Sequence, residues 1–171
     1  MIQVIPNWHP IFVHFPIAFA TAALAFTAVG KVFKDRPWAV QCLIMGHWML
    51  WAAAITACIA AVFGWFAYNS VIHDEAGHLA MTIHRNWAMG ALGALILLAV
   101  WASRTYRSAE APSHVFLFLL AAMWLLLAIT AWHGGEVVYR HGLGVMALPD
   151  VDDEQDAIPD DEGGHEHEHP H

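Results

Sequence analysis

Four long apolar runs dominate the sequence and leave very few folds open to it. They cover residues 11–30, 38–67, 87–103 and 115–133. Each is long enough to cross the hydrocarbon core of a bilayer, about 30 Å, once the third run is extended back to His84 or Asn86. Backbone polar groups find no water in that core, so we expect each run to be a helix. The chain is 58% hydrophobic and only 13% charged, as membrane proteins are.

Short connections between the runs predict an all-α, four-helix transmembrane bundle of up-down topology over residues 1–149. Most of the seven lysines and arginines lie in the connections 31–37 and 104–113, which such a bundle places on one side. The positive-inside rule assigns that side to the cytoplasm. We therefore expect a multi-pass protein of a bacterial inner (plasma) membrane, surrounded by lipid, with both termini in the periplasm.

The C-terminal segment 150–171 differs in composition from everything before it. It contains most of the fifteen acidic residues and ends HEHEHPH. Such a segment cannot bury a core, so it is predicted to be a disordered, His-rich tail. His165, His167 and His169 alternate with carboxylates, a pattern that can bind zinc or copper; a merely solvated or engineered end stays open. The body has no basic patch, which argues against a nucleic-acid partner.

Histidines concentrate at one end of the predicted bundle. Of the thirteen, only His47 and His114 belong to its inner half. His14, His84 and His133 come from three helices and are expected in one layer. Neutral imidazole suits haem iron, zinc or copper, and small residues on the second and third helices offer a slot for a flat group. The alternative is that these histidines hydrogen-bond carbonyls and one another to hold the bundle together.

The segment 132–145, WHGGEVVYRHGLGV, marks where the last run meets water. Gly134 and Gly135 are typical of a helix C-terminus. If the helix persists beyond them, His133, Glu136 and Arg140 share one face. In that case Glu136 is expected to support a ligand or accept a proton, and Arg140 to pair with a haem propionate.

Motifs of common enzymes are missing from the sequence, and whether the chain is an enzyme stays open. There is no nucleophile elbow, phosphate loop, CxxC or CxxCH, so a haem would be held without a covalent bond. Glu75 and His78 have the Glu-x-x-His spacing of di-iron sites. They are expected to lie in a loop, where water solvates both side chains.

Two terminal motifs resemble an uncharacterised bacterial family of predicted four-span membrane proteins. They are HPIFVHFP at 9–16 and GGEVVYRHGLGV at 134–145, and His84-Arg85 resembles the family's entry to its third helix. The resemblance covers about residues 9–145. It implies four spans and points to His14, His84 and His141 as shared polar positions. Relatives joined to Rieske-type or cytochrome c-type domains imply electron transfer, whereas the His-rich tail departs from the family pattern.

The leading interpretation is a small b-type cytochrome, or haem-carrying subunit, that passes electrons between quinol and an outer-side redox partner. That partner would be a periplasmic cytochrome c or a Rieske-type protein. His14 and His84 are the expected axial ligands of haem b, with His133 or His141 as substitutes. The alternatives are binding or transport of zinc or copper, with His14 and His84 as inner ligands, and a structural subunit of a respiratory complex. Association into a homo- or hetero-oligomer is left open.

Overall fold

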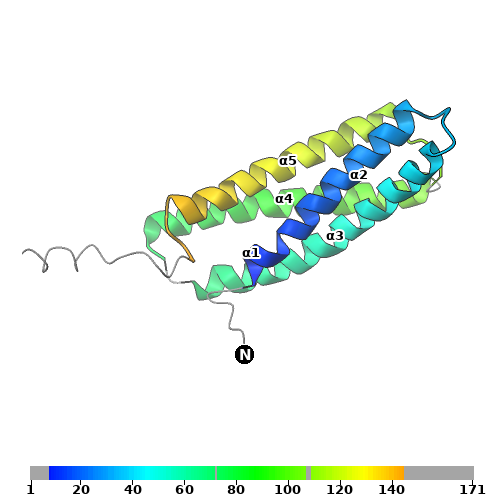
Figure 1. Cartoon of the computed structure of the whole chain (residues 1–171). Helices are drawn as coiled ribbons and strands as arrows, with labels where there is room; N and C mark the ends of the chain where they lie inside the picture. Colours follow the sequence, from blue (N-terminus) through cyan, green and yellow to red (C-terminus); the bar gives the residue numbers. More distant parts are fainter. Residues whose placement is uncertain (1–7, 72, 107–108, 145–171) are drawn as a thin grey trace, which may run out of the picture.

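The computed structural model describes residues 8–71, 73–106 and 109–144, and this part of the chain is built of helices (Figure 1). In chain order they are α1 (His9–Phe12), α2 (His14–Val32), α3 (Ala39–Ser70), α4 (Glu75–Thr105) and α5 (His114–Tyr139). α1 and α2 form one span, because the amide of Val13 still donates to the carbonyl of His9 at 3.1 Å. Four spans are thus long and apolar enough to cross a membrane, which confirms the predicted fold. The predicted tail, 150–171, lies outside the described residues.

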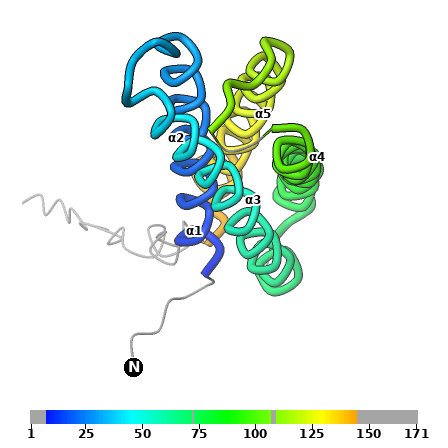
Figure 2. Tube along the Cα trace, turned by 90° about the vertical axis from the view of Figure 1, so that its right-hand side faces the viewer, coloured from blue at the N-terminus to red at the C-terminus, as the bar shows by residue number. Residues whose placement is uncertain are grey.

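The spans are arranged as a four-sided bundle (Figure 2). Its neighbouring pairs are α2–α3, α3–α4, α4–α5 and α5–α2, so α2 lies diagonally across from α4. Successive spans run in opposite directions, as the short connections predict. α1 and α4 begin, and α3 and α5 end, at the same end of the bundle (Figure 1). We call this the histidine end.

Packing inside the bundle is densest in the half remote from the histidine end. Leu95 and Leu120 are the largest fully buried side chains there, and alanines such as Ala53 let the backbones approach closely. The outer surface carries large apolar side chains such as Trp65, Leu97 and Phe118, each more than half exposed. A surface of this kind is solvated by lipid tails. Near the histidine end, the side chains of His9 and His84 lie between the helices.

Helix α4 begins earlier than the sequence suggested. The carboxylate of Asp74 caps it by accepting from the amide of Gly77 at 2.7 Å, and the first helical residue is Glu75. The expectation that this span begins at His84 or Asn86 is therefore wrong. The Glu75–His78 pair lies in the first turn of a helix rather than in a loop.

Helix α5 continues through Gly134 and Gly135, so the prediction that these glycines end it is also wrong. Gly142 provides the terminating conformation instead, with φ of 60° and its amide donating to the carbonyl of Val138 at 3.0 Å. A glycine inside a helix costs about 1 kcal/mol relative to alanine. At Gly134 a close contact with another helix explains why a glycine stands there.

Candidate functional site

His9 lies at the histidine end against the backbone of α3. Its Nδ1–H donates to the carbonyl of Ala60 at 2.9 Å. One turn further along α3, Gly64 faces the ring: a Cβ at this position would lie 3.0 Å from Cε1 and 3.1 Å from Nδ1 of His9. A Cβ this close is tighter than almost all real Cβ contacts, so the imidazole would have to shift on the carbonyl. Glycine is therefore part of the docking site.

His84 is docked on α5 in the same way. Its Nδ1–H donates to the carbonyl of Thr130 at 3.1 Å. Gly134, again four residues beyond the carbonyl, would place a Cβ 3.0 Å from Cε1 of His84. The hydroxyl of Thr130 turns back along its own helix to Leu126 and leaves the carbonyl to the histidine. This contact accounts for the glycine in the interior of α5.

His9 and His84 contact the returning helices in the same pattern, which we call the docking unit. In each, a histidine on the first helix of a helical hairpin donates to a carbonyl of the returning helix, and a glycine follows that carbonyl residue by four positions. The first unit belongs to the hairpin of α1–α2 and α3, the second to that of α4 and α5. The units meet between the diagonal spans, where the ring centres of His9 and His84 are 6.2 Å apart and the planes are inclined by 69°. We call these two residues the histidine pair.

The hydrogen bonds define the chemistry of the histidine pair. A carbonyl only accepts, so the proton of each neutral ring is on Nδ1 and the lone pair is on Nε2. Nε2 is also the ring nitrogen farther from the docking glycine, 3.7 Å from the would-be Cβ at both Gly64 and Gly134. Metal-ligating histidines show this arrangement, with the other ring nitrogen donating to a carbonyl or carboxylate.

His14, the expected partner of His84, lies on the exposed side of α2. It follows His9 by five positions, and at about 100° per residue the two side chains point to different sides of the span. The structure therefore brings His84 together with His9, a residue that sequence reasoning missed. A signal was present, because Ala60–Gly64 and Thr130–Gly134 repeat the same small-residue spacing on the two returning helices.

Comparison with known proteins places this architecture in a family. A family model described as a predicted membrane protein, DUF2231, matches residues 6–147. The chain belongs to this family. No curated protein and no solved structure matches it. The histidine pair, both docking carbonyls and both docking glycines lie within the DUF2231 region.

The other expected site residues of this DUF2231 chain line a groove on the α4–α5 side of the bundle. Its volume is about 260 Å³, and His133, Glu136 and His141 contribute its polar wall. The Oε2 of Glu136 is 3.6 Å from Nδ1 of His133, and Nε of Arg140 donates to Oε1 of Glu136 at 3.2 Å. These residues share one helix face, as their spacing predicts. Glu136 follows Gly134 by two residues, which corresponds to a rotation of about 200° around α5. Glu136 therefore faces away from the histidine pair.

A second cluster of histidines lies where α3 is connected to α4. Nδ1–H of His73 donates to the carbonyl of Val71 at 2.7 Å, so Nδ1–H of His78 donates to Nε2 of His73 at 2.9 Å. Tyr68 continues this chain of polar groups: its hydroxyl lies 3.4 Å from Nε2 of His78 and 3.0 Å from Oγ1 of Thr82. The cluster ties the ends of the two helices together at the histidine end of the bundle.

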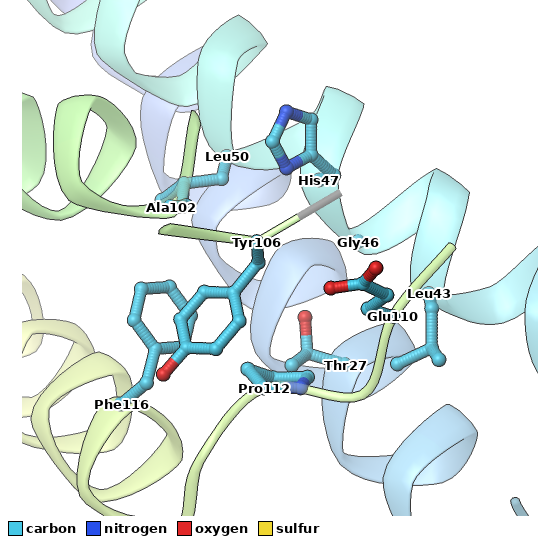
Figure 3. Close-up of a pocket in the computed structure, with 10 residues that line it drawn as sticks. All are labelled: Thr27, Leu43, Gly46, His47, Leu50, Ala102, Tyr106, Glu110, Pro112 and Phe116. Carbon is cyan, nitrogen blue, oxygen red and sulfur yellow. The ribbon is translucent and has the colours of Figure 1, made fainter. Parts of the chain in front are cut away.

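At the opposite end of the DUF2231 bundle, a small cavity of about 30 Å³ lies between α2, α3 and the start of α5 (Figure 3). His47 and Glu110 are among its lining residues, together with Thr27 and Tyr106. The hydroxyl of Tyr106 donates to Oγ of Ser113 at 2.8 Å. A cavity of this size has room for about one or two waters. It is too small for a cofactor.

Within residues 8–71, 73–106 and 109–144, no group of three or more His, Cys, Asp or Glu is placed to hold a metal ion. The zinc or copper site predicted at His165, His167 and His169 lies outside these residues and stays a prediction. The described chemistry of the chain thus centres on two features, the histidine pair and the groove.

Proposed function

We propose that this chain is a small b-type cytochrome, or haem-carrying subunit, of a bacterial inner membrane. It holds one haem b, without a covalent bond, between His9 and His84. The observation that carries the proposal is the histidine pair itself, with each imidazole docked through Nδ1–H on a carbonyl and seated on a glycine. The protein passes electrons between membrane quinol and an outer-side redox partner, such as a periplasmic cytochrome c or a Rieske-type protein.

The spacing of the pair fits an iron ion between two imidazoles. A metal–nitrogen bond of about 2.0 Å and about 1.1 Å from nitrogen to ring centre, taken on both sides, span about 6 Å. The ring centres of His9 and His84 are 6.2 Å apart. Haem iron takes only its axial ligands from the protein, whereas zinc sites use three or four protein ligands. Two imidazoles at this separation are enough for the axial positions of a haem and too few for a zinc site, which favours haem over the zinc or copper alternative.

The chain's own residues prepare these ligands. The carbonyls of Ala60 and Thr130 fix the tautomer and hold the ring planes. Gly64 and Gly134 leave room for the rings beside those carbonyls. A haem bound there supplies one-electron transfer. Its place at the histidine end brings it near a partner that docks on that side of the membrane.

Purification tests the proposal directly. The protein, expressed in a haem-replete host and purified in detergent, should show an intense Soret band and about one haem b per chain by the pyridine haemochrome assay. Elemental analysis should find iron in the same ratio. A colourless protein would overturn the cytochrome proposal, and a stoichiometric amount of zinc or copper in it would favour metal handling instead.

The histidine end is proposed to face the periplasm. Support comes from Lys31, Lys34, Arg36 and Arg104, which all lie at the opposite end, where Lys31 also donates to the carbonyl of Pro112. In a chain lacking Cys42 and Cys58, Glu75→Cys should react with a membrane-impermeant maleimide in intact spheroplasts, and Asp35→Cys should react only after lysis. The opposite labelling pattern would reverse the orientation.

A further inference from the structure

The groove between α4 and α5 at the histidine end has the properties of a second binding site. We propose that it binds the ring of a membrane quinol, the electron donor of the haem. The inference rests on the proposed function and adds to it a place for the donor. It is carried by the shape of the groove, the polar groups on one wall, its opening to lipid, and its position at the level of His84 along α4.

The two walls of the groove have different chemistry. α4 contributes an apolar wall from Ala76, Leu79, Ala80 and Ile83, and α5 contributes His133 and Glu136. The volume of about 260 Å³ lies just below the range of small-molecule pockets, about 300–1,000 Å³. It therefore suits a single substituted ring. A quinol ring is flat and apolar on its faces and carries hydroxyl groups at its edge, which matches one apolar and one polar wall.

The polar wall offers a carboxylate acceptor with an imidazole beside it. Oε2 of Glu136 and Nδ1 of His133 are 3.6 Å apart, too far for a strong hydrogen bond with each other, so the carboxylate oxygen can accept from a hydroxyl of a bound ring. Arg140 holds the other oxygen of the carboxylate at 3.2 Å. Trp87 stacks on His133 with ring centres 5.7 Å apart, which keeps the imidazole from swinging away. Both groups are thus oriented before a ligand arrives.

The groove is open to the bilayer. Leu79 is 62% exposed and Ile83 38% exposed, on a helix that is apolar enough to span the membrane. A quinol can therefore enter sideways from the lipid, and its isoprenoid tail can remain there while the ring is bound. A water-soluble ligand gains nothing from such an entrance.

The groove reaches the level of His84 along α4 and of Gly134 along α5, although Glu136 faces away from the histidine pair. Ile83, on its apolar wall, precedes His84 in the chain, and His133, on its polar wall, precedes the Gly134 that contacts the His84 ring. On oxidation, both O–H bonds of the quinol break and both C–O bonds become carbonyls. The two hydroxyls of a quinol point away from opposite edges of the ring, so Glu136 would accept the proton of the one that faces the polar wall, and the other proton would leave to water at the open mouth of the groove. A haem held by His9 and His84 would supply the one-electron acceptor, taking the two electrons one at a time for the outer redox partner.

Anaerobic calorimetric titration of the detergent-purified protein with decylbenzoquinol tests the site. We expect saturable binding, weakened about tenfold or more by Ala80→Phe, which fills the groove, and by Glu136→Gln, which removes a charged acceptor. The matched control is Leu97→Phe on the same helix, which adds a ring to a position that is 71% exposed and far from the groove; it should bind as wild type does.

Equal binding by Ala80→Phe and wild type, or partitioning without saturation, would overturn the proposed site. A phospholipid as the natural occupant would give that result as well, because quinol would then enter only the detergent micelle. His9→Ala separates this inference from the proposed function, since the groove is lined by α4, α5 and His141 just after α5, and not by α1. It should bind the quinol normally after losing haem. Haem without quinol binding removes only this inference, and quinol binding without haem removes only the cytochrome.

Discussion

His9→Ala and His84→Ala should each lower the haem-to-protein ratio of the purified chain by about tenfold or more, because either change removes one of the two imidazoles of the pair. Loss of a group that only supports a metal ligand already costs about 10–100-fold in affinity, and loss of the ligand itself costs more. The haemochrome assay measures the ratio. Circular dichroism and gel filtration in detergent show that the variants remain folded.

The matched control for these variants is His14→Ala. It removes an imidazole from the same span, but from its exposed side, and should keep a wild-type haem content. Free imidazole should restore a Soret band to His9→Ala, since it can occupy the space of the lost ring, and a histidine with a purely structural role predicts no such rescue. Haem loss in His14→Ala together with haem retention in His9→Ala would return the ligand role to His14.

Valine at either docking glycine should displace the histidine that rests on it. The Cβ alone would lie 3.0 Å from Cε1 of His84 in Gly134→Val and from Cε1 of His9 in Gly64→Val. Overpacking of this kind costs about 1–3 kcal/mol, and the carbonyl contact that orients the ring is lost. We expect haem affinity to fall by about 10–100-fold, measured by transfer of haem to apomyoglobin.

Gly135→Val is the control for this pair, because its Cβ would meet nothing closer than Tyr139 at 3.9 Å. It makes the same change of helix propensity one residue away and should leave haem affinity within about twofold of wild type. If Gly135→Val lowers haem affinity as much as Gly134→Val, the effect comes from the helix and not from the docking of His84.

The sequence was sufficient for the architecture because membrane helices are specified by composition over a whole run. It was not sufficient for the face that a residue occupies. In a span that is apolar all round, periodicity does not distinguish the inner side from the lipid side. The sequence pattern therefore does not distinguish His9 from His14, and the deeper position of His14 in the apolar run favours His14 as the haem ligand. The sequence indicates how deep a histidine lies along its span, but not which side of the helix it occupies.

The two errors at helix ends share a physical origin in tertiary contacts. By its local sequence Gly134 resembles a helix terminator, but in the structure it lies inside α5 against the ring of His84. The start of α4 depends on Asp74, whose carboxylate captures the amide of Gly77, while the local sequence HDEAGH reads equally well as a polar connection. In both cases a contact between side chain and backbone decides a boundary that local propensity leaves open.

The most direct test of the central claim, that His9 and His84 ligate one haem, is the electron paramagnetic resonance spectrum of the oxidised, purified protein. Two imidazole planes inclined by 69° should give a low-spin ferric signal with stronger anisotropy than parallel planes give. The signal should disappear in both His9→Ala and His84→Ala. A high-spin ferric signal in the wild type, or a low-spin signal that survives in both variants, would show that the histidine pair is not the haem site.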